Sequence, residues 1–311
     1  MKAIRVDEYG GPDVLVMRDV PDPEAAPGRI VVAIEAASVN PIDWKTRAGM
    51  RRDASALPLI LGCDFSGTVS AVGAGVEEFT AGDAVFGVAP QEGDGTYAEA
   101  IAIDAGLVAP KPDRLSHVEA AAHALVGLTA LVSLEDTAKV QAGESVLIQG
   151  GAGGVGGFAV QYAKHAGATV FATTSTRNVQ YVAGLGADTV IDYTKEDFAE
   201  AVPPCDVVFD TVGGEVQERS FSVLKPGGRL VYIARGSDGA PPPPDHIRML
   251  RPQVNRDRAH MERIVGLLEA GALIAPEITR LPWTEIAKAH ELIATGHVRG
   301  KIVLDVGQVS A

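Results

Sequence analysis

Cys63 and Asp64 place a thiol and a carboxylate side by side in the stretch 61–67, LGCDFSG. Both groups can bind a transition metal, and both can take part in catalysis. A zinc site, however, needs Cys, His or carboxylate ligands that converge. The histidines are scattered and form neither an HxH nor an HExxH pair, and no CxxC pair exists. The residue types therefore predict no metal site, and a Gly-x-Ser-x-Gly nucleophile motif is also absent.

The glycine loop at residues 150–156, GGAGGVG, is the strongest local signal. It contains Gly-x-Gly-x-x-Gly, follows the apolar run 146–149 and opens a helical period over 155–166. Glycine torsions allow the tight turn, a phosphate can approach where no Cβ stands, and a helix N-terminus offers N–H groups to an anion. We predict a dinucleotide site that includes Gly151, Gly153, Gly154, Val155 and Gly156. A purely structural glycine-rich turn is the alternative.

The end of the following strand indicates which dinucleotide binds. An NAD site usually carries Asp or Glu about 20 residues after the glycines, whereas residues 173–178 here read TTSTRN. A carboxylate would repel a 2′-phosphate, while hydroxyls and a guanidinium would bind it. We therefore predict NADP(H), with Thr174, Ser175 and Arg177 at its adenosine end. The alternatives are a solvated Arg177 side chain and a plain helix N-cap at Ser175 or Thr176.

The elements that must position these groups are of two kinds. Up to about residue 120 the chain is β-rich, with short runs such as 31–39, 68–72 and 97–101 between glycines and prolines. This pattern is typical of a small barrel or sandwich. Residues 116–119, SHVE, have the form of a capping box and introduce an alanine-rich helix. From Glu144 onwards strands and helices alternate, with one helix expected at 216–224, and this alternation predicts an α/β fold with a doubly wound parallel sheet.

Composition narrows the class of protein. The chain has 311 residues, enough for about two domains, and a net charge of −13, which argues against a nucleic-acid surface or a polybasic membrane patch. Two cysteines cannot form a disulfide framework and fit a cytoplasmic compartment. We find no apolar, charge-free window long enough to predict a transmembrane helix, and the N-terminus lacks the apolar run of a signal peptide.

Several short motifs, in order along nearly the whole chain, resemble the medium-chain dehydrogenase/reductase superfamily, and within it the zinc-free quinone oxidoreductase branch. Besides the glycine loop they are SVNPID at 38–43, GCDFSG at 62–67, GDAVFG at 82–87, GTYAE at 95–99, GLTA at 127–130, GLGAD at 184–188, KPGGR at 225–229 and GKIVL at 300–304. The resemblance implies a GroES-like β-barrel domain, formed by residues 1–124 and 263–311, and a Rossmann domain at 125–262.

The resemblance also gives meaning to Cys63-Asp64. Zinc-dependent members of the superfamily carry Cys at the position of Asn40, Ser or Thr at that of Ile42, and Gly-His-Glu where this chain has Gly62-Cys63-Asp64. We therefore predict that no residue of this chain serves as a metal ligand. Cys63 is interpreted as a small apolar filler.

The resemblance places Asn40 and Thr129 near the nicotinamide end of the cofactor, as positioning residues. For Asn40 an Asx-type turn before Pro41 is an equal alternative, and Asp43 is interpreted as a structural hydrogen-bond acceptor. By the same resemblance Tyr193 is expected near the adenosine phosphate; the alternative is that Asp192-Tyr193 simply ends a strand. Ile233 and Ala234 lie near the carboxamide.

Without a Lewis acid the acceptor must take a hydride unaided, as quinones and activated alkenes do. The predicted function is NADPH-dependent reduction of a quinone or an enone or alkenal. The alternatives are an enoyl-thioester reductase, disfavoured because residues 48–51, AGMR, lack the proton-donating tyrosine of similar enzymes, and a non-catalytic NADPH-binding sensor or structural protein. A strand near 249–254 is expected at the sheet edge, where it could pair with its copy in a homodimer.

Overall fold

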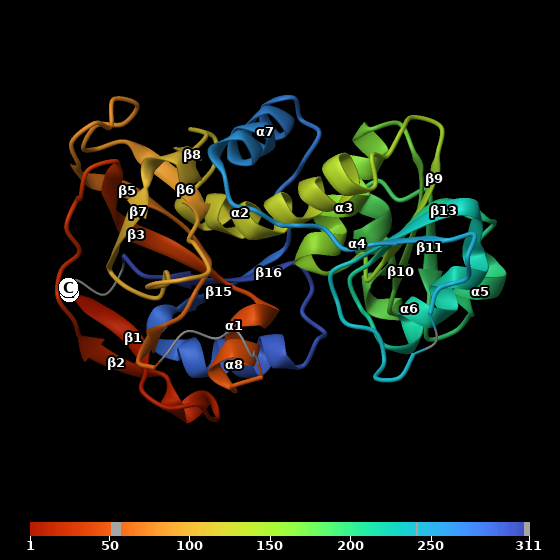
Figure 1. Cartoon of the computed structure of the whole chain (residues 1–311), viewed down its shortest axis with the longest axis horizontal. Helices are drawn as coiled ribbons and strands as arrows, with labels where there is room; N and C mark the ends of the chain where they lie inside the picture. Colours follow the sequence, from red (N-terminus) through yellow and green to blue (C-terminus); the bar gives the residue numbers. More distant parts are fainter. Residues whose placement is uncertain (51–56, 241, 308–311) are drawn as a thin grey trace. The chain divides into compact units, whose positions relative to one another are not determined.

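The computed structural model describes residues 1–50, 57–240 and 242–307. Arg51, the last residue of the stretch 48–51 that lacks a tyrosine, lies outside the described residues. The chain forms two compact units (Figure 1). The first comprises Met1–Leu125, Arg256–Glu269 and Ala275–Ala311, and the second comprises Val126–Asn255 and Ala270–Ile274. The first unit was expected to end at residue 124 and to resume at residue 263. It ends one residue later, at Leu125, and resumes seven residues earlier, at Arg256.

The second unit is an α/β unit built on a parallel sheet. Its strand order is β11-β10-β9-β12-β13-β14, and neighbouring strands are all parallel. The strands are β9 Ser145–Gln149, β10 Thr169–Thr174, β11 Thr189–Asp192, β12 Cys205–Asp210, β13 Leu224–Tyr232 and β14 Arg248–Leu250. The α-helices between them are α3 Gly154–His165, α4 Val179–Gly184, α5 Phe198–Ala201 and α6 Glu215–Arg219. The predicted doubly wound sheet is confirmed, and β14 lies at its edge as expected.

The first unit is β-rich. Its larger sheet has the order β15-β16-β3-β5-β6-β8 with β7 paired to β3, and a smaller sheet has the order β2-β1-β4. The strands are β1 Lys2–Val6, β2 Val16–Asp19, β3 Arg29–Val39, β4 Leu59–Ile60, β5 Asp64–Val72, β6 Ala84–Val88, β7 Ala100–Asp104, β8 Val108–Pro110, β15 Ile278–Pro282 and β16 Lys301–Asp305. Helices α1 Pro41–Arg47, α7 Arg258–Glu269 and α8 Ile286–Ala294 also belong to this unit. This is the GroES-like arrangement that the resemblance implies.

Two predicted elements were wrong in detail. The strand expected at 97–101 begins at Ala100, because Tyr97 instead exchanges backbone hydrogen bonds with Leu61 and Ile4. The helix expected at 216–224 ends at Arg219 and continues as a 3₁₀ turn, Ser220–Val223, before β13 begins.

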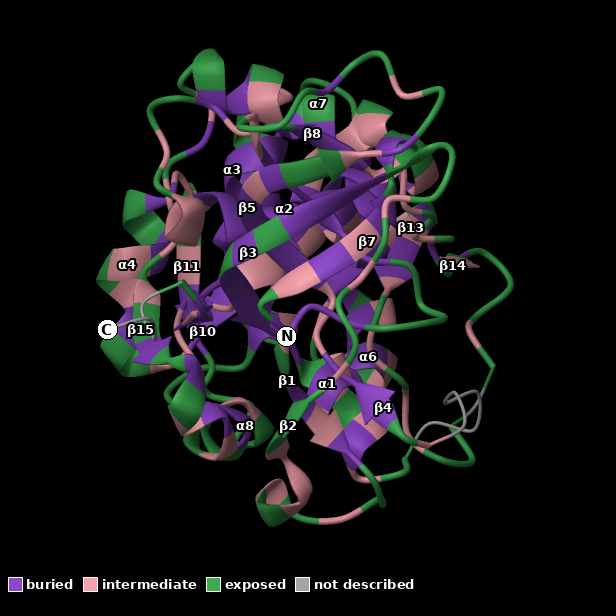
Figure 2. Cartoon of the chain, turned by 90° about the vertical axis from the view of Figure 1, so that its left-hand side faces the viewer, coloured by how far each residue is buried: buried purple, intermediate pink, exposed green. Residues whose placement is uncertain are grey.

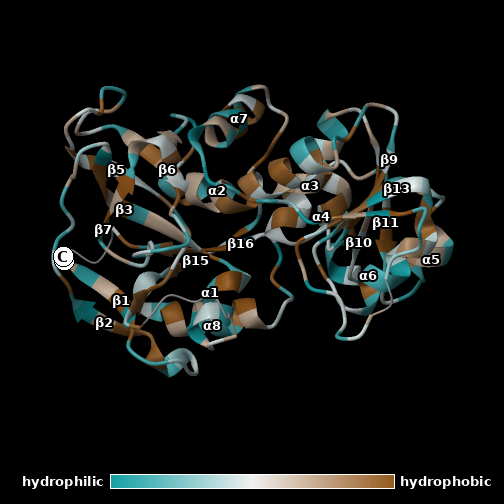
Figure 3. Cartoon of the chain, in the orientation of Figure 1, coloured by the Kyte–Doolittle hydropathy of each residue, from teal (hydrophilic) through white to brown (hydrophobic). Residues whose placement is uncertain are grey.

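The apolar core of the first unit lies between its strands and α8, and the buried residues follow β3 in Figure 2. Helix α7 buries Met261, Ile264, Leu267 and Leu268 on one side, so hydrophilic and hydrophobic residues alternate around it in Figure 3. Helix α7 contacts β6 and β8, and α8 contacts β3, so C-terminal segments pack against the N-terminal strands.

Helix α2, His117–Leu131, begins at the predicted capping box, in which the Ser116 N–H and the Glu119 N–H donate to each other's side chains. With the π-helical turn Val132–Thr137 it is the one helix, among the described residues, long and apolar enough to cross a membrane by length and composition. Because 72% of its apolar window is buried inside the fold, it has the character of a core helix.

Candidate functional site

Strand register in the first unit gathers polar side chains at one end of the larger sheet. Ser38 at the end of β3 pairs with Asp64 at the start of β5, and Val39 pairs with Ile302 near the start of β16. Asn40 follows Val39, and Lys301 precedes Ile302. The register therefore brings Asp64, Asn40 and Lys301 together from three segments that are far apart in sequence.

The Asp64 carboxylate is fully buried and is bound by donors from three elements. Its Oδ1 accepts from Ser38 Oγ at 2.7 Å and from Asn40 Nδ2 at 2.8 Å, and its Oδ2 accepts from the Leu125 N–H at 3.3 Å. The carboxylate is thus a structural acceptor within the sheet end.

Asn40 connects this carboxylate to a buried ammonium group. Its Nδ2 donates to Asp64, while its Oδ1 accepts from Lys301 Nζ at 2.7 Å, and the same Nζ lies 3.3 Å from the Val39 carbonyl. Lys301 is 4% exposed, and burial lowers its pKa from the ordinary value although Asp64 and Asp43 act against this shift. Both ends of the Asn40 amide are therefore engaged within the first unit, and its predicted role at the nicotinamide stays a prediction.

Asp43 lies at the third position of α1, where the Asn40 N–H donates to its Oδ2 at 2.8 Å. Tyr97 OH donates to the same oxygen at 2.8 Å, and Cys63 Sγ lies 3.4 Å from Oδ1. The carboxyl group is a buried acceptor, as expected from the sequence. Burial raises its pKa to about 6 even though the bonds from Tyr97 and Asn40 favour the charged form.

A pocket of about 150 Å³ opens beside this group, and its wall includes Ile42, Asp43, Thr46, Leu61, Cys63 and Arg256. A cavity of that size can hold a single six-membered ring. Cys63 is partly exposed and hydrogen-bonded, so its interpretation as a mere apolar filler was wrong. Burial raises the pKa of its thiol well above the usual range, and the Asp43 and Asp64 carboxylates raise it further.

In the second unit the glycine loop lies where the order of strands reverses. The chain winds from β9 outward through β10 and β11, then returns beside β9 and winds outward through β12, β13 and β14. In such sheets ligands bind at the carboxyl ends of the strands on either side of this reversal. Thr211 after β12 donates to the Gln149 carbonyl at 2.7 Å, which fixes the two strand ends to each other.

The loop glycines serve different purposes. Gly150 has φ +77°, and a Cβ on Gly156 would lie 2.2 Å from the Gly150 carbonyl oxygen, so both are required by the turn itself. A Cβ on Gly153, at the N-cap of α3, would lie 3.6 Å from the Gly150 carbonyl oxygen, which is an ordinary van der Waals contact. Packing within the protein therefore does not require glycine at this position. The missing side chain suits the close approach of a pyrophosphate at the N-terminus of α3.

Sequence reasoning missed the side chains that hold this loop. Thr173 Oγ1 donates to Gln149 Oε1 at 2.7 Å and accepts from the Gly150 N–H at 3.1 Å. Both Thr173 and Gln149 are buried. Their only sequence signal was a polar residue at the end of an apolar strand.

The predicted adenosine-end residues lie at the carboxyl ends of β10 and β11. Thr174 is buried, Ser175 is half-buried, and Arg177 and Tyr193 are exposed. The Tyr193 N–H donates to the Thr174 carbonyl at 3.0 Å, so these two residues are adjacent.

A carboxylate also lies at this edge, on the strand next to β10. Asp192 pairs with Thr174, accepts from Thr176 Oγ1 at 2.6 Å and forms an ion pair with Lys195 at 3.1 Å. Its charge is thereby offset by a cation. Lys195 adds a positive side chain that the sequence analysis did not single out.

The remaining predicted contacts are also in the second unit. Ile233 is exposed, and its N–H donates to the Asp210 carbonyl at 3.1 Å. Ala234 follows it, and its carbonyl lies 3.4 Å from Gln217 Nε2. Thr129 is half-buried on α2, and its carbonyl accepts from Ser133 Oγ at 2.6 Å.

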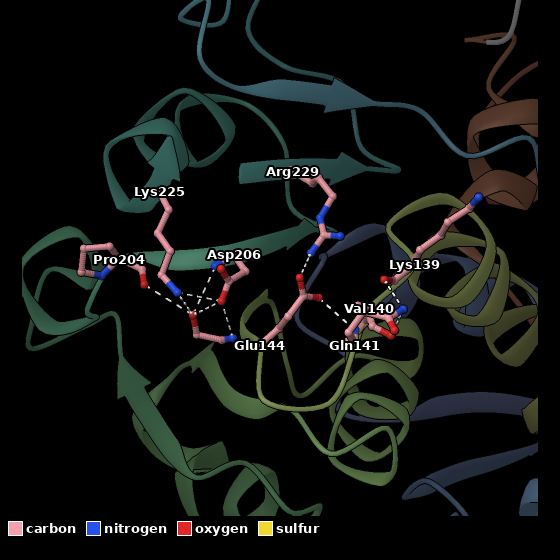
Figure 4. Close-up of polar contacts among 9 residues, drawn as sticks. Lys139, Val140, Gln141, Glu144, Pro204, Asp206, Lys225 and Arg229 are labelled. Atoms are coloured by element: carbon pink, nitrogen blue, oxygen red, sulfur yellow. Dashed lines mark hydrogen bonds and ion pairs between the residues drawn. The ribbon is translucent and has the colours of Figure 1, made fainter. Parts of the chain in front are cut away.

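The opposite, amino-terminal edge of the same sheet carries an ionic cluster (Figure 4). Asp206 Oδ2 accepts from Lys225 Nζ and from both the N–H and the hydroxyl of Ser145, each at 2.8 Å. Arg229 forms an ion pair with Glu144. Burial alone would raise the pKa of Asp206, but the bonds from Lys225 and Ser145 outweigh it and lower the pKa to about 2.

No group of three or more Cys, His, Asp or Glu side chains suited to a metal ion occurs within residues 1–50, 57–240 and 242–307. Cys63 and Asp64 turn to different partners, Asp43 for the thiol and Ser38 and Asn40 for the carboxylate.

Two family models match the chain. Residues 26–113 match the alcohol dehydrogenase GroES-like domain, and residues 185–304 match the zinc-binding dehydrogenase family.

Similar proteins extend over nearly the whole chain. The 2-methylene-furan-3-one reductase of Solanum lycopersicum is 36% identical, over 98% of this chain and 79% of the relative. The structure of the quinone oxidoreductase from Coxiella burnetii superposes with a TM-score of 0.90 at 37% identity, covering 98% of this chain and 99% of the other. That of the Escherichia coli quinone oxidoreductase complexed with NADPH gives 0.88 at 29% identity, covering 98% and 100%.

Proposed function

Because the chain belongs to the medium-chain dehydrogenase/reductase superfamily, in its quinone oxidoreductase branch, we propose that it is an NADPH-dependent oxidoreductase that reduces a quinone or an activated alkene. The observation that carries this proposal is the glycine loop at the strand reversal of the second unit, where a Cβ on Gly153 would make no close contact within the protein. Bound NADPH would supply the hydride.

The residues of the second unit suit the cofactor along its length. Gly151, Gly153, Gly154, Val155 and Gly156 would hold the pyrophosphate, Thr174, Ser175, Arg177 and Tyr193 the adenosine phosphate, and Ile233 and Ala234 the carboxamide. In the first unit, the pocket of about 150 Å³ suits a quinone ring or a short alkenal. We assign positioning roles to Asn40 and Thr129.

The test is oxidation of NADPH by the purified protein with quinones, enones, alkenals and enoyl thioesters as acceptors. We expect turnover with quinones or enones and slower turnover with enoyl thioesters. NADPH binding without turnover on any acceptor would favour the alternative of a non-catalytic nucleotide-binding protein.

Preference for NADPH over NADH rests on the adenosine end. Arg177→Ala should raise the KM for NADPH about tenfold or more and leave the KM for NADH nearly unchanged, because only NADPH carries the 2′-phosphate. An equal rise for both cofactors, or a wild-type preference for NADH, would contradict the assignment. Lys195→Ala tests the neighbouring cation in the same assay.

We also propose that the reaction needs no zinc. Asn40 stands at the position where zinc enzymes of the superfamily carry a zinc ligand. Its Oδ1 already accepts a hydrogen bond from a cation, the Lys301 ammonium, at 2.7 Å. Elemental analysis of active protein should find less than about 0.1 zinc per chain. Stoichiometric zinc, lost together with activity on chelation, would contradict this.

A cytoplasmic homodimer is the expected setting. Strand β14 ends the parallel sheet and offers an edge for pairing with a second copy, and both cysteines are free thiols. A monomeric mass by light scattering would contradict the homodimer. Fractionation of the native protein with membranes or an organelle would contradict the cytoplasmic location.

A further inference from the structure

The reduction of a quinone or alkene by hydride also requires one proton. None of the cofactor-binding and positioning roles assigned above supplies it. A proton donor must lie beside the bound acceptor, in the wall of the pocket of the first unit. Two ionisable side chains lie in its wall and contact each other, Cys63 and Asp43.

The hydrogen bonds of Asp43 fix where its proton can reside. Oδ2 already accepts two donors, the Asn40 N–H and Tyr97 OH, each at 2.8 Å. A carboxyl oxygen offers two lone-pair sites. In the neutral acid the proton therefore belongs on Oδ1, which faces Cys63 Sγ at 3.4 Å.

The position of that proton directs the thiol. When Oδ1–H donates to Sγ, the thiol hydrogen is free to rotate away from Asp43 and towards the pocket. Cys63 then presents its S–H to whatever occupies the pocket, with a second proton held directly behind it.

We propose that Cys63 and Asp43 form a two-step proton relay that completes the reduction of the acceptor. This inference rests on the proposed function. As the hydride reaches the acceptor, the Sγ–H bond breaks and a new O–H bond forms on the quinol oxygen, or a new C–H bond on the α-carbon of the enolate. In the same step the Oδ1–H bond breaks and Sγ–H re-forms. Asp43 remains as a carboxylate and regains a proton from solvent after product leaves the pocket.

The surrounding charges fit this sequence. Burial holds the pKa of Asp43 at about 6, so its neutral form is accessible near physiological pH, and the high pKa of the Cys63 thiol means that it passes a proton without persisting as a thiolate. Other groups near the pair are Tyr97, Asp64, Lys301 and Arg256, and Arg256 and Glu92 also line the pocket. His290 packs edge-on against the Tyr97 ring, and burial lowers its pKa to about 3, so it stays neutral over the working range.

The test compares Cys63→Ala, which breaks the relay, with Cys63→Ser, whose hydroxyl can accept from Oδ1 and donate into the pocket. The matched control is Cys205→Ala, which removes the other, fully buried thiol in the second unit. The assay follows NADPH oxidation by a 2-substituted enone in H₂O and D₂O across pH 5 to 9.

We expect C63A to lower kcat by about 100-fold with little change in KM, as is typical for loss of a positioned proton donor. In the wild type kcat should fall as pH rises through about 6, because the relay needs neutral Asp43. C63A should lose both this dependence and most of the solvent isotope effect. C63S should recover at least a tenth of wild-type kcat, and C205A should match the wild type.

Wild-type kcat, pH profile and isotope effect in C63A would overturn the relay and leave the proposed function intact. Equal losses in C63A and C63S, with a raised KM in both, would also overturn it, since they would show that Cys63 only shapes the pocket. Absence of turnover in the wild type with every acceptor would overturn the proposed function itself.

Discussion

Asp43 in the first unit and Asp206 in the second are the same side chain in opposite circumstances. Asp43 is 2% exposed, and its hydrogen-bond partners are an amide, a phenol and a thiol. The side chain of Asp206 is 27% exposed, and it is bound by the Lys225 ammonium as well as by Ser145. The pKa of Asp43 rises to about 6, and that of Asp206 falls to about 2.

The difference shows which property suits a carboxyl group to which task. Burial among neutral donors keeps Asp43 close to the point where it can gain or lose a proton, which is what proton transfer requires. A cation at 2.8 Å keeps Asp206 charged throughout the physiological range, so it can only serve as a fixed link between strands. The different partners of these two carboxyl groups, rather than their residue type, thus separate the one suited to proton transfer from the one suited to a structural link.

The largest expected effect comes from removing the buried cation near Asp43. Lys301→Met should lower the free energy of unfolding by about 3 to 5 kcal/mol, because Asn40 Oδ1 loses its donor and the nearby buried carboxylates lose a compensating charge. Urea unfolding measures this loss. The matched control is Lys288→Met, whose ammonium is 58% exposed and pairs with Glu285; it should cost less than about 1 kcal/mol. Equal effects of the two substitutions would remove the distinction between buried and exposed charge on which the comparison rests.

Asp43→Asn should change stability in a pH-dependent way. In the wild type the unfolded carboxyl group ionises near its ordinary pKa of 3.8 and the folded one near 6, so the folded state binds more protons between these values. Stability contributed by Asp43 is therefore present below about 3.8 and is lost as pH rises through about 6. The variant lacks this loss, so relative to wild type it should gain up to about 3 kcal/mol between pH 3.5 and 7. A difference that stays constant with pH would show that Asp43 is ionised in the fold at its ordinary pKa.

The two regions also differ in how far the sequence could predict them. The glycine loop and the strands around it follow from local patterns, because turn glycines, helix starts and apolar runs are short-range features. The contacts of Asp43 and Asn40 depend instead on pairing between β3, β5 and β16, which joins residues 40, 64 and 301. No local pattern specifies that register. The interpretation of Asp43 as an acceptor was confirmed, but Lys301, Tyr97 and the hydrogen bond of Cys63 could not be foreseen.

Asp206→Asn should have the smallest of these effects and the opposite dependence on pH. Since the pKa of Asp206 is lowered in the fold, its contribution to stability is present above about 3.8 and disappears as pH falls towards 2. We expect a loss of about 1 kcal/mol at pH 7, reduced by solvent screening because Lys225 is 44% exposed, and no loss near pH 2. A double-mutant cycle with Lys225→Met should assign most of that loss to the ion pair. D206N could instead gain stability relative to wild type as pH rises, as D43N is expected to do. That result would show that partial exposure and a lysine neighbour do not distinguish a structural carboxylate from a reactive one in this chain.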